Sequence, residues 1–204
     1  MDGLVELMGG RDAFIGKLDS LFTADSKLEG ESTSVDISGL IGQYAHGNEP
    51  SHHIAHLYNY VGQPWRTQEI VDEVLHTLYF NNPDGLSGNE DCGQMSAWYL
   101  FSVMGFYPVC PGTDQYVLGA PYLPYLKLTL PNGKTLEIKA PGVSDKKRYV
   151  QSLKLNGESY DKMYITHEDI LKGGVLEFKM SASPNKRRGV SVQDKPYSLT
   201  NGIN

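Results

Sequence analysis

Apolar residues recur at spacings of three and four along the first half of the chain, a period that predicts amphipathic helices. Upstream, Gly9-Gly10 ends an apolar run at residues 4–8, because glycine readily adopts the left-handed conformation found at helix ends. The clearest stripe consists of Phe14, Ile15, Leu18, Leu21 and Phe22.

Three further helices are predicted before residue 80. A short one is expected over Ile37–Tyr44, after a polar loop at residues 23–34. Another begins near Pro50, since proline is well tolerated in the first turn of a helix. The last follows Pro64 and has an apolar stripe of Ile70, Val71, Val74, Leu75, Leu78 and Tyr79.

The stretch Gly93–Phe106 is apolar on nearly every side, and a helix of this kind is expected to be buried. A strong turn signal at residues 81–85 and an acidic loop precede it. A polar loop carried by a buried helix is a common setting for a catalytic site.

Beyond Phe106 the hydrophobic period changes to two, and turns rich in Pro and Gly separate six short runs. These runs cover residues 115–118, 125–130, 135–140, 149–155, 162–165 and 175–180. Their length and spacing predict an antiparallel sheet or sandwich. Thr166–Asp169 has the pattern of a capping box, which predicts one helical turn between the last two strands. The sequence thus predicts an α+β chain, helical over residues 1–106 and β over residues 107–204.

The composition is that of a globular protein, with 40% hydrophobic and 21% charged residues. A formal net charge of -6 argues against nucleic acid as a partner. The sequence has no run of 18 apolar residues, so no membrane span is predicted, and no signal peptide follows Met1. Cys92 and Cys110 either form a disulfide or remain free.

The loop Gly88–Gln94 is the first candidate site. Asp91 with Gln94 three residues later fits a capping box at the start of the following helix. That interpretation leaves Asn89, Glu90 and the nearby Asp84 unexplained. Carboxylates gathered at a helix start are also suited to hold a metal or to act as a base, so both interpretations stay open.

The segment Asn48–His53 is the second candidate. Proline restrains the preceding Glu49 to an extended backbone, so its side chain is expected at the mouth of a helix. The segment is either a cap with solvated histidines or an oxygen-rich Ca²⁺ site. His52 and His56 have metalloprotease spacing, but His53 replaces the expected glutamate, so zinc is disfavoured.

Two long motifs then identify a resemblance. GNEPSHHIAHLYNYVGQPW and NNPDGLSGNEDCGQMSAWYLFSVMGFYPVCPGTDQY closely resemble glycoside hydrolase family 92, the exo-acting α-mannosidases. The similarity runs from Met1 to about Leu123 and continues more loosely beyond. It implies the last helices of an (α/α)6 barrel, followed by β-structure that packs with a sandwich domain, so the chain is expected to be incomplete.

The resemblance also implies site residues. Asp91 matches the family's general base, and Asn89 stands where many members have a second aspartate. Asn48 and Glu49 match the stretch that contributes to a calcium site. By the same resemblance, Glu90 and either His52 or His53 are candidates for the pocket wall. Independently of the resemblance, Asp114 and Tyr116 lie on the first strand after the helix and are weaker candidates for lining the same opening.

The implied function is part of a Ca²⁺-dependent, inverting exo-α-mannosidase acting on terminal mannose of glycans, with α-1,2 linkages in N-glycans or mannan expected. The family's general acid lies in a Glu-Gly-x-x-Trp-Gln motif, which does not occur in this sequence. We therefore expect this chain to be inactive alone and to pair with a missing N-terminal portion or with itself. The family implies a secreted, periplasmic or cell-surface parent protein. The alternative is that the β part is a carbohydrate-binding or purely structural module.

Overall fold

The computed structural model describes residues 1–29, 34 and 36–202. The predicted loop at residues 23–34 lies partly outside these residues, as does the end of the predicted β part. Within the described ranges, no helix is long and apolar enough to cross a membrane.

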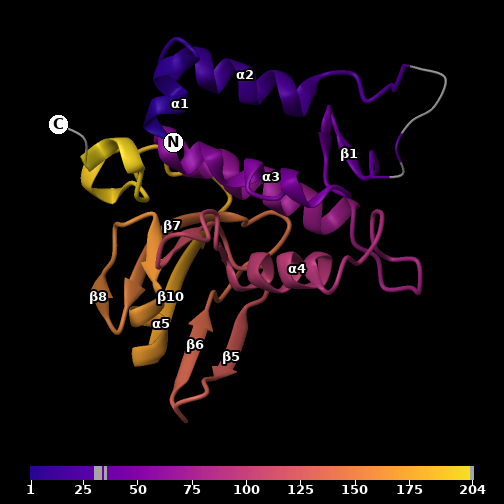
Figure 1. The fold of residues 1–204 in the computed structure, drawn as a ribbon. Helices are drawn as coiled ribbons and strands as arrows, with labels where there is room; N and C mark the ends of the chain where they lie inside the picture. The colour runs from indigo at the N-terminus through magenta and orange to yellow at the C-terminus, as the bar shows by residue number, and fades with distance from the viewer. Residues whose placement is uncertain (30–33, 35, 203–204) are drawn as a thin grey trace.

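Helices form most of the first half of the chain (Figure 1). The α-helices are α1 (Asp2–Leu7), α2 (Arg11–Thr23), α3 (Pro64–Thr77), α4 (Gln94–Met104) and, between two strands, α5 (His167–Lys172). The 3-10 helices are η1 (Glu49–Ser51), η2 (Ile54–Val61), η3 (Val192–Asp194) and η4 (Leu199–Gly202). The chain returns to its start, since the Met1 ammonium group donates to the Ser198 hydroxyl.

Strands form three sheets. The hairpin β1 (Leu40–Ile41) and β2 (Tyr44–Ala45) is separate from the others. A three-stranded sheet contains β3 (Phe106–Tyr107), β4 (Gln115–Leu118) and β9 (Tyr164–Thr166) in that order. The five-stranded sheet has the order β5 (Tyr125–Thr129), β6 (Thr135–Lys139), β10 (Gly174–Ser181), β7 (Tyr149–Leu155) and β8 (Glu158–Ser159).

The sequence predicts an antiparallel sheet, but the five-stranded sheet also contains one parallel pair of strands. Its strand β10 pairs in parallel with β6, with Leu176 opposite Ile138, and antiparallel with β7. After β8 the chain leaves this sheet, adds β9 to the three-stranded sheet and returns through α5. A crossover of this kind is what allows a strand to enter beside a parallel neighbour. The capping box that starts α5 is confirmed by the bond from Asp169 N to Thr166 Oγ1 at 3.1 Å.

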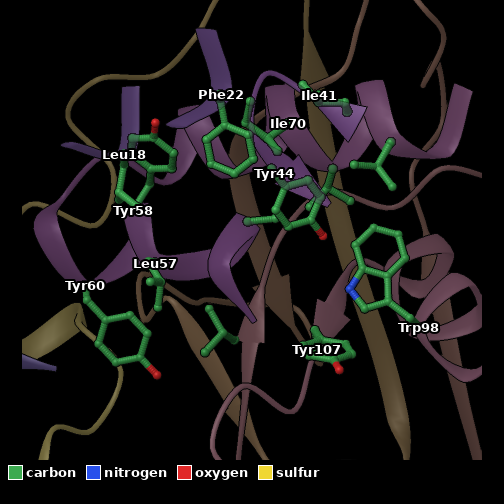
Figure 2. Packing of buried hydrophobic residues seen from close by; sticks show 14 of the residues in the cluster. Leu18, Phe22, Ile41, Tyr44, Leu57, Tyr58, Tyr60, Ile70, Trp98 and Tyr107 are labelled. Atoms are coloured by element: carbon green, nitrogen blue, oxygen red, sulfur yellow. The ribbon is translucent and has the colours of Figure 1, made fainter. Parts of the chain in front are cut away.

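Two apolar clusters hold the fold together. The first joins α2, η2, α3 and α4 around Phe22, Tyr58 and Trp98 (Figure 2). The second lies in the sheets around Leu136, Ile138, Leu153, Leu176 and Phe178. The partly buried Phe101 of α4 packs against both clusters. The helical and β parts are therefore in contact through α4, and the fold is a mixed α and β structure as predicted.

The short helix predicted over Ile37–Tyr44 is wrong, because β1 and β2 form a hairpin there. Gly39 and Gly42 both have φ of 59°, a left-handed conformation that a helix excludes. A Cβ on Gly42 would lie 2.4 Å from the Leu21 carbonyl oxygen, so the hairpin turn packs directly on α2. The spacing of its apolar residues resembles that of a helix, although the segment is not helical.

Two other helix predictions need correction. The helix that begins near Pro50 is formed by the 3-10 helices η1 and η2 rather than by an α-helix. The helix α4 is not buried on all sides, because Leu100 is 59% exposed while Trp98 is fully buried. Its outward apolar face belongs to a groove of about 570 Å³ shared with the end of α3 and lined in part by Tyr79, Phe80 and Tyr99.

Candidate functional site

The first half of the site is the segment that connects β2 to η1. Gly47 passes close to two neighbouring segments, where a Cβ would lie 2.1 Å from Ser38 Oγ and 3.0 Å from the Ser87 carbonyl oxygen. Asn48 is extended, with φ of -115° and ψ of 112°, and Pro50 stands in the first turn of η1. Glu49 lies at the mouth of a helix as expected, but the extended backbone predicted for it is wrong, because Glu49 is the first residue of η1 and Asn48 is the extended residue. Asn48 and Glu49 are both half-buried.

The second half is the turn that precedes α4. Asp91, Cys92 and Gly93 have consecutive φ angles of 48°, 57° and 92°. Two non-glycine residues in the left-handed region are uncommon, and such conformations concentrate at functional sites. The turn is closed by Gln94 N, which donates to the Asp91 carbonyl oxygen at 3.2 Å. It presents the Asp91 carboxylate to solvent immediately before α4.

The capping box predicted for Asp91 and Gln94 is wrong. Gly93 occupies the position before α4, and no side chain caps that position. Glu90 instead accepts hydrogen bonds from Ser96 N and from Ser96 Oγ, both at 2.9 Å. Since Glu90 supports the start of the helix, Asp91 remains free to contact a different partner.

That partner is Glu49, 42 residues earlier in the chain, whose side chain lies within hydrogen-bonding reach of Asp91. The hydrogen bond with Glu49, partial desolvation and the like charge together raise the pKa of Asp91 above its ordinary value. Glu49 Oε1 is buried and has no hydrogen-bond partner among the described residues. Two adjacent carboxylates, one with an unsatisfied oxygen, can share a proton or coordinate a cation.

A buried polar network lies beneath this pair. His52 Nε2 lies 2.9 Å from the His46 carbonyl oxygen, and His52 Nδ1 lies 3.1 Å from Gln94 Nε2. Trp98 Nε1 donates to the His52 carbonyl oxygen at 3.1 Å. Figure 2 shows the indole nitrogen of Trp98 and the hydroxyl of Tyr44 turned toward the space between them. The network thus ties the Glu49 segment to the first turns of α4.

The histidines of this network are held neutral. Burial, and next the neighbouring His52, lower the pKa of His46 from its ordinary value to about 3. Burial likewise lowers the pKa of His52. The His46 ring lies between the Tyr44 hydroxyl at 2.9 Å and the Tyr79 hydroxyl at 2.7 Å. Uncharged imidazoles can fulfil these hydrogen bonds without an unpaired buried charge.

The remaining predicted residues occupy different surroundings. Asn89 is exposed, and His53 is half-buried. His52 is buried with both ring nitrogens engaged, so its ring supports the site from below. Asp114 and Tyr116 line a separate hollow with His167, and no described contact joins them to Asp91. Cys92 and Cys110 are both free, exposed thiols, so the disulfide alternative is not realised.

Sequence reasoning missed the structural roles of Gln94, Trp98 and His46. One signal was present, because Gln94 and Trp98 are four residues apart and therefore share a helix face. Both direct a polar group toward a single residue, His52, which lies 42 and 46 positions away in the chain. No local pattern could have identified that partner.

The oxygen-rich segment provides a fit test for calcium. Ca²⁺ prefers carboxylate, amide and carbonyl oxygens, and Asn48, Glu49 and Asp91 offer such groups. The unpartnered Glu49 Oε1 is an acceptor that a cation would satisfy. In the part of the chain that the structure describes, no group of three or more His, Cys, Asp or Glu side chains is placed to hold a metal. These residues therefore fit part of a calcium shell rather than a complete one.

Comparison with known proteins adds independent findings. The family model described as "Glycosyl hydrolase family 92 catalytic domain" matches residues 1–182 of this chain. A GH92 α-mannosidase of Bacteroides thetaiotaomicron, solved with mannoimidazole, is 45% identical over 93% of this chain, with a TM-score of 0.89. An inverting GH92 mannosidase of B. thetaiotaomicron VPI-5482 is 40% identical over 97% of this chain, with a TM-score of 0.84.

A curated relative from Arthroderma benhamiae, named an uncharacterized secreted glycosidase, is 31% identical over 206 residues and is matched by the whole of this chain. The chain spans only about a quarter of each relative's length, with 25% and 28% of the two bacterial enzymes and 24% of the fungal protein covered.

Proposed function

The chain belongs to glycosyl hydrolase family 92, and from this membership we propose that the protein hydrolyses terminal α-mannosyl residues with inversion at the anomeric carbon. The observation that carries the proposal is that Asp91 and Glu49, from two motifs 42 residues apart, are neighbours close enough for Glu49 to raise the pKa of Asp91. The relatives solved as α-mannosidases support mannose as the sugar.

In this proposal Asp91 is the general base. An inverting glycosidase places a base and an acid roughly 6.5–9.5 Å apart, with a water between the base and the anomeric carbon. Asp91 is exposed, so a water has access to its carboxylate, and the left-handed turn fixes its direction. The carboxylate takes the proton of this water as its oxygen attacks the sugar. The Asn89 amide is not basic enough to accept a proton from water, which leaves the task to Asp91.

Asn48 and Glu49 would hold Ca²⁺, with Asp91 nearby, since they combine amide and carboxylate oxygens with one unpartnered buried acceptor. A calcium ion bound there supplies a template for sugar hydroxyls and positive charge beside the carboxylates. Glu90 orients the turn by bonding Ser96, and His53 is proposed to contribute to the pocket wall. His52 supports the same wall through its ring contacts.

The general acid is not assigned to any residue of this chain. A carboxylic acid at the required separation is proposed to come from the part of the family's length that this chain does not span. The 204-residue chain alone is therefore expected to release no mannose from an aryl α-mannoside in the presence of Ca²⁺. Robust turnover by the chain alone would contradict this division of labour.

For the β part we propose a structural role rather than glycan binding. Its strand β7 is anchored to α3, since Val150 N donates to Gln68 Oε1 at 3.1 Å and Arg148 pairs with Asp72 at 3.0 Å. We further propose α-1,2-linked mannose of N-glycans or mannan as the substrate and a location outside the cytoplasm. The secreted glycosidase among the relatives supports that location.

The test of the proposed function uses this chain joined to the part of the family's length that it does not span. Asp91→Asn preserves size and tolerates the left-handed conformation, while it removes the proton acceptor. Mannose release should fall by roughly 10²–10⁴-fold. Asp84→Asn is the matched control, because Asp84 is an exposed carboxylate of the preceding turn, and it should retain full activity. Near-normal turnover by Asp91→Asn would reject Asp91 as the base.

A further inference from the structure

Gln94 is the first residue of α4 and lies directly after the turn that carries Asp91. Its amide nitrogen is 3.1 Å from His52 Nδ1 and 3.2 Å from the Tyr107 hydroxyl. The side chain therefore reaches from the Asp91 turn into the segment that carries Glu49. Its sequence position alone suggested a helix cap, a role that the structure does not give it.

The hydrogen bonds of the network determine the donor and acceptor of each group. The His46 carbonyl oxygen can only accept, so His52 Nε2 must bear the proton of that bond. His52 Nδ1 is then a lone-pair acceptor, and the Gln94 amide nitrogen donates to it. The second amide proton is directed at the Tyr107 oxygen. A glutamine is the residue type that satisfies both acceptors at once.

His52 connects directly to the Glu49 segment. His52 N donates to the Glu49 carbonyl oxygen at 3.0 Å, which closes η1. The Trp98 indole holds the His52 carbonyl oxygen from one turn further along α4. A displacement of the His52 ring would therefore move Glu49 relative to Asp91.

We infer that Gln94 is a positioning residue that clamps the Glu49 segment to the Asp91 turn through the neutral ring of His52. The inference rests on the proposed function insofar as the two carboxylates belong to the catalytic site. It adds that their separation is set by a half-buried amide–imidazole hydrogen bond, rather than by the loops themselves. Gln94 does not contact the sugar in this proposal, and its effect is transmitted through His52.

The test is a double-mutant cycle on the 204-residue chain, with thermal midpoints measured at neutral pH without Ca²⁺. Asp91→Asn removes a like charge beside Glu49 and should raise the Tm. Gln94→Met keeps the length of the side chain but makes neither hydrogen bond. In the Gln94→Met background the carboxylates move apart, so the rise caused by Asp91→Asn should disappear.

Ser96→Ala is the control for a general loosening of α4, because it removes only the hydroxyl bond to Glu90. The rise caused by Asp91→Asn should persist in that background. An equal rise in the wild-type and Gln94→Met backgrounds would overturn the clamp. This outcome leaves the catalytic proposal untouched, since it concerns only how the carboxylates are held.

A second measurement uses the whole protein. Gln94→Met should lower kcat for an aryl α-mannoside by up to about 100-fold with little change in KM, because the base is misplaced while binding groups remain. Gln94→Asn, which has the amide but is one methylene shorter, should not restore kcat. Unchanged kcat in Gln94→Met would also overturn the inference. A wild-type protein without mannosidase activity would reject the proposed function and leave the thermal cycle as the test of the clamp.

Discussion

Two charged regions of this molecule are built in opposite ways. At the interface of α3 with β7, Asp72 pairs with Arg148 at 3.0 Å and lies 3.5 Å from His76. At the start of α4, Asp91 instead faces Glu49, a like charge, and Glu49 Oε1 has no partner among the described residues. The first region satisfies its charges internally, whereas the second leaves them available.

The backbones of the two regions also differ, since one is regular and the other is strained. Asp72 lies in the helix α3, in which no residue has a left-handed backbone conformation. Asp91 and Cys92 adopt left-handed conformations that cost free energy. Unpaired charge and backbone strain at one place indicate a function, while complementary charges between two elements indicate a structural contact.

The largest effect is expected at Trp98, which supports the site from beneath. Its side chain is fully buried, lies edge-on to His46 at 4.4 Å and donates to the His52 carbonyl oxygen. Trp98→Ala should lower the free energy of unfolding by about 3–5 kcal/mol in urea denaturation. Trp65→Ala is the control, since Trp65 is only half-buried, and it should cost clearly less. Equal losses would mean that the site has no special packing beneath it.

A large pH effect is expected from the buried histidines. Burial, with smaller contributions from neighbouring histidines, lowers the pKa of His46 and of His56 to about 3. Below pH 6.5 the unfolded chain binds protons that the folded chain does not, so stability falls as the pH falls. Two such groups give a slope approaching ~2.7 kcal/mol per pH unit. Urea midpoints between pH 7.5 and about 5 measure this slope.

His56 provides the variant that checks this interpretation. Its ring nitrogens are buried without hydrogen-bond partners in the described chain, and its ring stacks on Tyr107 at 5.1 Å. His56→Phe should leave stability at neutral pH unchanged or higher, because a buried polar group is replaced by an apolar ring of similar shape. It should also reduce the pH slope by up to ~1.4 kcal/mol per pH unit, while His46 and His52 continue to contribute. An unchanged slope would show that His56 does not titrate with unfolding.

A moderate loss is expected at the paired region. Asp72 is 17% exposed, so its ion pair with Arg148 lies between the buried and the surface cases. Asp72→Asn should cost roughly 1–2 kcal/mol. Glu73→Gln, at an exposed position of the same helix, should be nearly neutral. If Asp72→Asn were also neutral, the internal pairing of this region would contribute nothing to stability.

The sequence predicted the elements whose pattern is local. Phe14, Leu18 and Phe22 are the buried face of α2, and the strand predicted over residues 149–155 is β7 with the same bounds. The hairpin at residues 40–45 was missed because two left-handed glycines, rather than its apolar spacing, determine it. The parallel pairing of β10 depends on where a distant crossover returns, which no local period encodes.

The site was predicted only in part for a similar reason. Residue types alone left Asp91 as a helix cap or a catalytic residue, and Glu49 as a cap or a metal ligand. We infer that they are held together by hydrogen bonds of His52 to His46 and to two residues of α4, Gln94 and Trp98, and no sequence pattern links these two segments. The family resemblance supplied what residue patterns could not.

The thermal midpoint of Asp91→Asn in the 204-residue chain, at neutral pH without Ca²⁺, tests the distinction between the two regions most directly. A carboxylate held against a like charge for function should stabilise the fold when it is neutralised. Asp91→Asn should therefore have a Tm above that of the wild-type chain, a change opposite in sign to that of Asp72→Asn. A lower Tm for Asp91→Asn would mean that Asp91 is a structural residue, and it would contradict a functional role for the unpaired carboxylates.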